Sequence, residues 1–239
     1  MKRLKKPFQN SFYTIVLVFS LCVVVGSLCK VVYEFIGLGG AQSKHFDCFS
    51  VIVDLIVSYF SALLMFFMGL NRFAAFSSPY LSDRLMRRKT VLGILFGLLV
   101  FSSLITIAVY ETSGMRRVFS QNAIMDYATK CIFVQVTSYI FYALPLFSSI
   151  FYLFAYKSLR SKRDSAVSDA TKSLLDKAER CNLKQGIWIL ITYLASLIIH
   201  IAMQFKSVDA TSMVVLSSLA TITSTAPQVA LPLAVLCCS

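Results

Sequence analysis

The sequence contains few charged residues, and this scarcity excludes an ordinary soluble domain. Only 14% of the 239 residues are charged, whereas 57% are hydrophobic and the mean hydropathy is +0.74. A typical soluble domain carries about 25% charged residues. A soluble fold of this length cannot hide so much apolar surface, so we expect a membrane protein.

Several patterns that carry chemistry are also absent. The seven cysteines show no C-x-x-C and no Cys/His metal spacing, so we expect no metal site and no cofactor. No Ser/His/Asp, Cys/His or paired-carboxylate arrangement falls on one side of the membrane, so we do not expect an enzyme. The first apolar stretch is followed by Lys30 and Glu34 rather than by small residues, which argues against a cleaved signal peptide.

Six stretches are long and apolar enough to cross a bilayer as helices. A hydrocarbon core about 30 Å thick needs about 20 apolar residues in a helix. The stretches are residues 12–36, 48–70, 90–110, 131–156, 185–205 and 210–236. We therefore predict an all-α fold, a polytopic bundle that forms a single transmembrane domain over residues 1–239.

Basic residues are distributed unevenly among the segments that separate these stretches. The N-terminus, the second loop and the fourth loop together hold 17 of the 23 Lys and Arg residues. Because cytoplasmic loops carry the excess of Lys and Arg, we predict that these segments and both termini are cytoplasmic. The net charge of +12 then indicates contact with anionic membrane lipids rather than binding to nucleic acid.

The fourth loop, residues 157–184, is the largest predicted segment outside the membrane. Its leucines and alanines recur about one helical turn apart, which is typical of helical extensions of the flanking spans. A solvated linker is an equally good interpretation of its mixed charges. The sequence leaves both interpretations open.

A short motif ends the second predicted span, where the chain reads Asn71-Arg72-Phe73. An Arg at a helix end often extends only to lipid phosphates. In this position, however, the motif resembles the Asp-Arg-Tyr motif that ends the third helix of rhodopsin-like G-protein-coupled receptors. Asn-Arg-Phe is a variant common in nematode serpentine chemoreceptors, and Pro79 in the next loop and Pro145 in a later span agree with that family.

This resemblance implies an architecture and a function. The six spans would correspond to helices two to seven of the family, so the chain would be a truncated gene product or an incomplete gene model. A cytoplasmic N-terminus agrees with a missing first helix. The family implies a plasma-membrane receptor that binds a small external ligand and signals through a heterotrimeric G protein. The surface facing the G protein would comprise Asn71, Arg72, Phe73, Pro79, Arg84, Arg87, Arg88 and Lys89.

The last predicted span departs from the family pattern. Pro232 is present there, but the Asn and Tyr of the family's Asn-Pro-x-x-Tyr motif are not, and the absence of Lys excludes a retinal Schiff base. Two alternatives therefore stay open: a small transporter or channel, and a receptor remnant that does not signal. Against a transporter, Pro145, Pro227 and Pro232 show no symmetry between two halves of the chain.

Asp54 is the strongest candidate for a ligand contact, because a carboxylate within a span is costly and usually functional. It lies 18 residues before Arg72, about five helical turns away and toward the outer side, where the resembled receptors bind ligands. An ionised Asp54 would pair with an amine. The alternative is that Asp54 is protonated, or hydrated near the membrane interface.

Two further polar pairs stand at helical spacing. His200 and Gln204 lie one turn apart near the outer end of the fifth span and are candidate ligand contacts, although packing is the commoner role for a lone intramembrane His. Lys30 and Glu34 stand at i, i+4, the spacing at which opposite charges pair on a helix. We expect Lys30 and Glu34 to neutralise each other at the outer interface.

Four cysteines carry predictions. In the resembled receptors a disulfide joins the start of the third helix to the next outer loop, which implies a bridge between Cys48 and Cys131. Both residues would face an oxidising compartment. Cys237 and Cys238 would lie just inside the membrane, where they are candidates for palmitoylation or ordinary interfacial residues.

Overall fold

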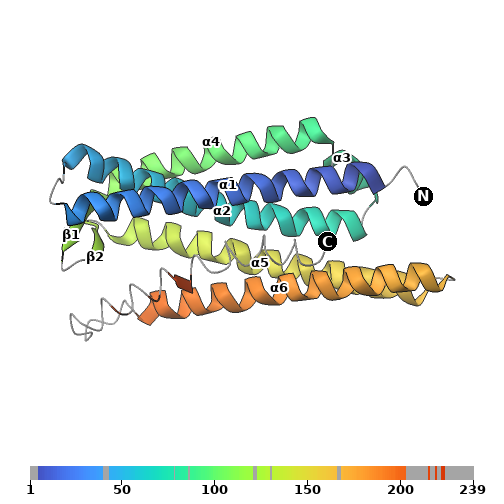
Figure 1. The fold of residues 1–239 in the computed structure, drawn as a ribbon. Coiled ribbons are helices and arrows are strands. Elements are labelled where there is room, and N and C mark those ends of the chain that lie inside the picture. The colour runs from blue at the N-terminus through green and yellow to red at the C-terminus, as the bar shows by residue number, and fades with distance from the viewer. Residues whose placement is uncertain are drawn as a thin grey trace.

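The computed structural model describes residues 5–39, 43–77, 79–85, 87–120, 123–129, 131–165 and 168–202, together with residues 215, 219, 222 and 223. Within these residues, long helices run antiparallel along one elongated bundle (Figure 1). The long helices are α1 (Lys5–Leu38), α2 (Lys44–Ser77), α4 (Arg88–Ser113), α5 (Cys131–Asp164) and α6 (Asp169–Ala202). The short elements are the helix α3 (Pro79–Leu85) and the strands β1 (Arg116–Ser120) and β2 (Ala123–Tyr127).

The five long helices are long and apolar enough to cross a membrane, so the protein has the composition of a multi-pass helical bundle. The first four predicted spans lie within α1, α2, α4 and α5, and the fifth lies in α6 as far as Ala202. The sixth predicted span, residues 210–236, falls almost wholly outside the described residues. The antiparallel β1–β2 hairpin departs from the all-α prediction. Strands of five residues are too short to show an apolar periodicity in the sequence, so they were not predicted.

Residues 157–164 and 169–184 are helical and do not form an extended linker. Helix α5 continues to Asp164 and α6 begins at Asp169, so the helical interpretation of this loop is confirmed. A helix of 34 residues is about 51 Å long, which exceeds a hydrocarbon core of about 30 Å. Arg163 of α5 donates from Nη1 to Glu179 Oε2 of α6 at 2.9 Å, which fastens the two extensions together.

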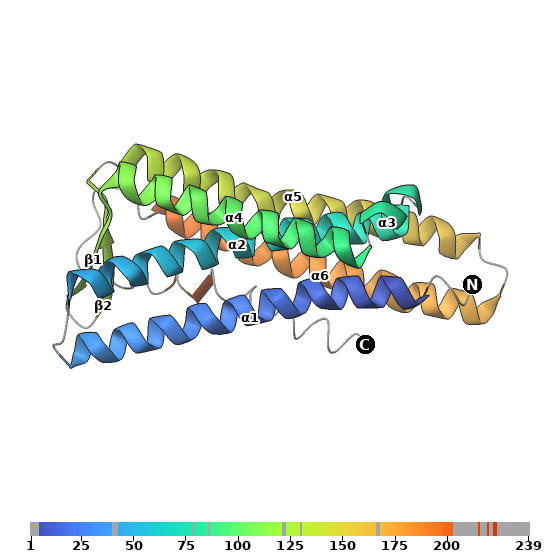
Figure 2. The same ribbon diagram turned by 90° about the horizontal axis from the view of Figure 1, so that it is seen from above.

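Helix α2 occupies the centre of the bundle. It packs against α1, α4 and α5, and α6 packs on α5 (Figure 2). The apolar part of α2 is more deeply buried than that of any other long helix described. Gly69 permits its closest approach to α5, because a Cβ at this position would overlap the Oγ atom of Ser148. Ser148 Oγ also donates to the Met65 carbonyl at 2.9 Å, so α2 and α5 are joined by both packing and hydrogen bonding.

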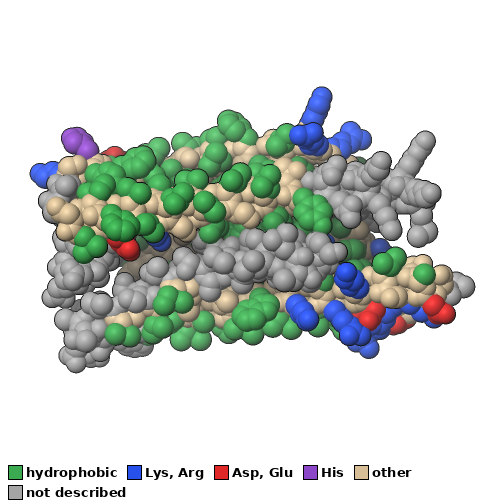
Figure 3. Space-filling view, viewed as in Figure 1, with side chains coloured by type: hydrophobic (Ala, Val, Ile, Leu, Met, Phe, Trp, Pro, Cys, Tyr) green, Lys and Arg blue, Asp and Glu red, His purple; other side chains and the backbone are tan. Residues whose placement is uncertain are grey.

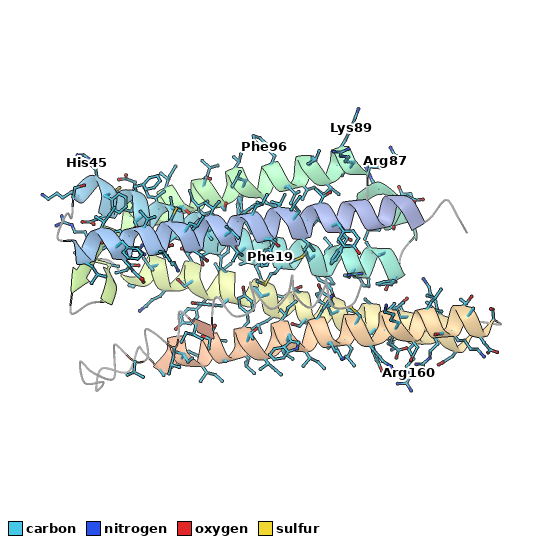
Figure 4. The ribbon with its side chains drawn as sticks, in the orientation of Figure 1. Phe19, His45, Arg87, Lys89, Phe96 and Arg160 are labelled. Carbon is cyan, nitrogen blue, oxygen red and sulfur yellow. The ribbon has the colours of Figure 1, made fainter. Side chains whose placement is uncertain are left out.

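The side-chain chemistry divides the bundle into an apolar flank and two polar ends. On the face that Figure 3 shows, hydrophobic side chains are spread along the length of the bundle, whereas most of the visible Lys and Arg residues gather at one end. We call this the basic end; it carries Arg87, Lys89 and Arg160, whereas His45 lies at the opposite end (Figure 4). The opposite end is the hairpin end, where β1 and β2 lie beside the start of α2.

Candidate functional site

The two candidate motifs lie toward opposite ends of the central helix. Asp54 lies toward the hairpin end of α2 and Arg72 toward the basic end. Their separation of 18 residues corresponds to about 27 Å along a helix. They therefore belong to two sites joined by one helix.

At the hairpin end, Asp54 is held by two cations. Arg117 approaches Asp54 Oδ2 with Nη1 at 2.7 Å, and Lys30 Nζ of α1 lies 3.8 Å from Asp54 Oδ1. The Asp54 side chain is only 13% exposed. A carboxylate that is this deeply buried needs a partner to remain ionised, and Arg117 supplies one.

Arg117 is the centre of these contacts. Its Nε and Nη2 atoms donate to Asp126 Oδ1 and Oδ2 at 2.7 and 2.8 Å, and Nη1 also donates to Ser50 Oγ at 2.7 Å. Burial alone would lower the pKa of the Arg117 guanidinium, but the ion pairs with Asp126 and Asp54 outweigh burial and raise its pKa. Arg117 is therefore a permanent cation. Lys30, Asp54, Arg117 and Asp126 are hereafter the hairpin-end network.

Aromatic side chains of α1 and α2 border this network. The guanidinium of Arg117 lies 5.4 Å from the centre of the Tyr33 ring, within the range of a cation–π contact. Tyr33 donates its hydroxyl to Asp47 Oδ1 at 3.0 Å, and its ring stacks on Phe46 with centroids 5.7 Å apart. The network thus joins α1, α2 and the hairpin at a single place.

The structure corrects the predicted pairing of Lys30 with Glu34. Lys30 lies beside Asp54 instead, and among the described residues Glu34 makes no ion pair. The reason is tertiary, because Lys30 can reach a buried carboxylate on the neighbouring helix, whereas Glu34 is exposed. The sequence prediction kept Lys30 within its own helix and so gave Asp54 no partner from the chain, whereas the structure gives it Lys30 and Arg117.

At the basic end, Arg72 is held by an aromatic ring rather than by a carboxylate. Its guanidinium carbon lies 3.7 Å from the centre of the Phe12 ring of α1. The Nε atom of Arg72 is buried and has no hydrogen-bond partner among the described residues. A guanidinium in this state retains donors for an incoming acceptor.

Of the neighbours of Arg72 in the motif, Asn71 is buried and Phe73 is half-buried. Asn71 is 2% exposed, and its Nδ2 atom also has no partner in the part of the chain that the structure describes. Phe73 packs against α5, with its ring 5.7 Å from Phe151 and 6.1 Å from Phe154. The motif is therefore anchored by Phe73 and leaves two buried polar groups unsatisfied.

The same end of α2 is tied to α5 through the backbone. Ser158 Oγ donates to the Phe76 carbonyl at 2.8 Å, and Lys162 Nζ donates to the same oxygen. The last carbonyls of a helix have no partner within the helix, and a cation there also complements the helix dipole. These contacts fix the position of the motif relative to the extension of α5.

Several predicted site residues are not tested by the described geometry. The Cys131 side chain lies outside the described residues, so the bridge between Cys48 and Cys131 stays a prediction. The remaining untested side chains are those of Pro79, His200, Gln204, Cys237 and Cys238, which also lie outside the described part. Of the predicted ligand contacts, only Asp54 can be placed.

Sequence reasoning did not find Arg117 or Asp126. One signal was present, because Arg117 follows Arg116 in a segment on the side that holds few basic residues. Arginine on that side calls for a reason other than orientation, and a buried carboxylate partner is such a reason.

Neither a protein-family model nor a curated protein sequence matches this chain.

Proposed function

We propose that this chain is a G-protein-coupled chemosensory receptor of the plasma membrane, which detects a small external molecule and signals through a heterotrimeric G protein. In this proposal the hairpin end faces the outside, and the basic end and both termini face the cytoplasm. The observation that carries the proposal is that one buried helix, α2, connects a charged site at one end with Asn71-Arg72-Phe73 at the other.

The packing of α2 suits such a connection. Because α2 contacts α1, α4 and α5, a change in its position alters most of the bundle. A ligand can shift a bundle between two arrangements only through its different affinity for them. A solute that contacts Asp54 would favour one arrangement of α2, and the exposure of Arg72 at the far end would follow.

The basic end has the features that a transducer surface needs. Arg84, Arg87, Arg88 and Lys89 are exposed and make no ion pair among the described residues. Arg72, toward the same end of α2, lies on the Phe12 ring, and its Nε donor has no hydrogen-bond partner among the described residues. An acidic or carbonyl-bearing segment of a G protein could accept hydrogen bonds from these cationic side chains. None of these side chains is paired with a carboxylate among the described residues.

A nucleotide-exchange assay tests the proposal. Membranes containing the full chain should increase GTPγS binding to at least one of a panel of purified heterotrimeric G proteins, even without ligand, because receptors populate active states spontaneously. The Arg72→Ala variant should lose this increase, because it removes the donor at the basic end.

The matched control is Arg116→Ala, which removes an exposed Arg at the hairpin end. It should retain the exchange activity of the parent, with both variants compared at equal amounts of folded protein. Exchange no greater than in membranes without the chain, for every G protein of the panel, would refute the proposal.

Glycosylation mapping tests the orientation. An Asn-x-Ser acceptor inserted between β1 and β2 should be glycosylated, whereas the same acceptor inserted between α5 and α6 should not. Modification of the α5–α6 insertion alone would reverse the orientation and place Arg72 on the outer side, where no G protein is found.

A further inference from the structure

The hairpin is too small to be stable by itself. It contains two strands of five residues, and Arg117 stands directly opposite Asp126 in its register. An isolated two-stranded hairpin is marginally stable at best in water. Contacts with the helices must therefore hold it in place.

Arg117 supplies these contacts. One edge of its guanidinium binds both oxygens of Asp126 across the hairpin, and Nη1 reaches α2, where it meets Asp54 and Ser50. A planar guanidinium suits this task because its donors are fixed in a fork. Arg117 is thus a three-way connector, and its side chain is only 4% exposed.

The neighbouring cation cannot replace it. Lys30 Nζ lies 3.8 Å from Asp54, beyond hydrogen-bond distance, and its side chain is 38% exposed. If the hairpin moved away from α2, Asp54 would keep only this weak contact in a mostly buried position. The separated state is therefore costly, and the cost is concentrated at the pair between Arg117 and Asp54.

We propose that Arg117 controls access to the Asp54 carboxylate. It holds the β1–β2 hairpin as a lid on the hairpin end of α2 and keeps the Asp54 carboxylate occupied. A solute carrying an ammonium group reaches Asp54 only when the contact between Arg117 and Asp54 opens. The role of the solute rests on the proposed receptor function, whereas the lid is a property of the fold.

Hydrogen–deuterium exchange of the purified full chain in detergent micelles tests the lid. In Arg117→Ala, amides of β1 and β2, residues 116–120 and 123–127, should exchange about tenfold faster or more than in the parent, because local opening becomes easier. The matched control is Arg116→Ala, which removes the adjacent exposed Arg and should leave the exchange of the hairpin unchanged.

Asp54→Asn distinguishes a lid from a hairpin that is merely stabilised internally. It leaves the contacts between Arg117 and Asp126 intact and also provides a second variant if Arg117→Ala does not fold. Faster hairpin exchange in Asp54→Asn supports the lid. Exchange at the parental rate in this variant overturns the proposal, because Arg117 would then act only within the hairpin.

The same variants separate this proposal from the receptor function. Hydrogen–deuterium exchange is measured without any G protein. If the lid fails this test, the proposed coupling to a G protein is unaffected. Conversely, the parent chain could fail to stimulate nucleotide exchange while the hairpin amides of Asp54→Asn exchange hydrogen faster. That result would refute the receptor function and support the lid.

Discussion

The two ends of helix α2 differ in whether their buried polar groups have partners. At the hairpin end, Asp54 and Arg117 pair at 2.7 Å, and Asp126 completes the guanidinium contacts. At the basic end, Arg72 lies on the Phe12 ring, and donors of Asn71 and Arg72 have no partner among the described residues.

The hairpin end is thus arranged for stability, whereas the basic end retains donors that bind nothing within the described residues. A buried ion pair with complete hydrogen bonding resists disturbance, because removing either partner leaves the other uncompensated. Buried donors without acceptors cost free energy, and such a cost is often found where a protein binds something else. The hairpin end is therefore closed in this structure, and the basic end is prepared for an acceptor.

The largest expected effect comes from breaking the hairpin-end network. Asp54→Ala should lower the free energy of unfolding by about 3 kcal/mol, the lower part of the range for disrupting a buried pair, because Asp126 continues to hold Arg117. Thermal unfolding in detergent micelles measures this loss. Asp83→Ala, which removes an exposed carboxylate of α3, is the control and should have little effect. Equal losses in both variants would contradict the special role of Asp54.

A change of opposite sign is expected at the basic end. Asn71→Leu replaces a buried amide that lacks a partner with an apolar side chain of similar size, so it should stabilise the protein by about 1 kcal/mol. The same thermal assay applies, and nucleotide exchange should fall at the same time if the motif couples to a G protein. A destabilisation as large as that of Asp54→Ala would show that Asn71 has an essential partner.

The smallest expected effect concerns an ion pair outside the membrane-crossing core. Asp176 contacts Arg180 at 2.8 Å and Arg163 at 3.4 Å near the tip of the α5–α6 extensions, where these side chains are much more exposed than Arg117. Asp176→Asn should cost no more than about 0.5 kcal/mol. This cost should shrink further in high salt, whereas the effect of Asp54→Ala should persist, because buried pairs are screened much less. Unfolding at two ionic strengths measures both responses.

The predicted disulfide between Cys48 and Cys131 rests on the family resemblance alone. Cys48 is half-buried near the start of α2, and its pairing stays a prediction. Its predicted partner, Cys131, begins α5 on the far side of the hairpin in the sequence. A motif can suggest that two cysteines meet, but only the path of the intervening chain decides whether they do.

The helical, membrane-type character of the protein could be predicted from its sequence. Long apolar runs without charges are local features, and each must form a helix in a bilayer because its backbone has no other hydrogen-bond partners there. The same local reasoning offered helical extensions of α5 and α6 as one of two equal interpretations, and the structure decided for the helices.

Which charges pair could not be predicted from the sequence, because the pairs depend on how the helices pack. Spacing along a helix favoured Lys30 with Glu34, but Lys30 lies beside Asp54 of the next helix. Arg117 reaches Ser50 across 67 positions in the sequence, because the segment between α4 and α5 forms a hairpin against α2. Local patterns report neighbours within about one turn, whereas these partners depend on how the helices pack and how a loop returns to the bundle.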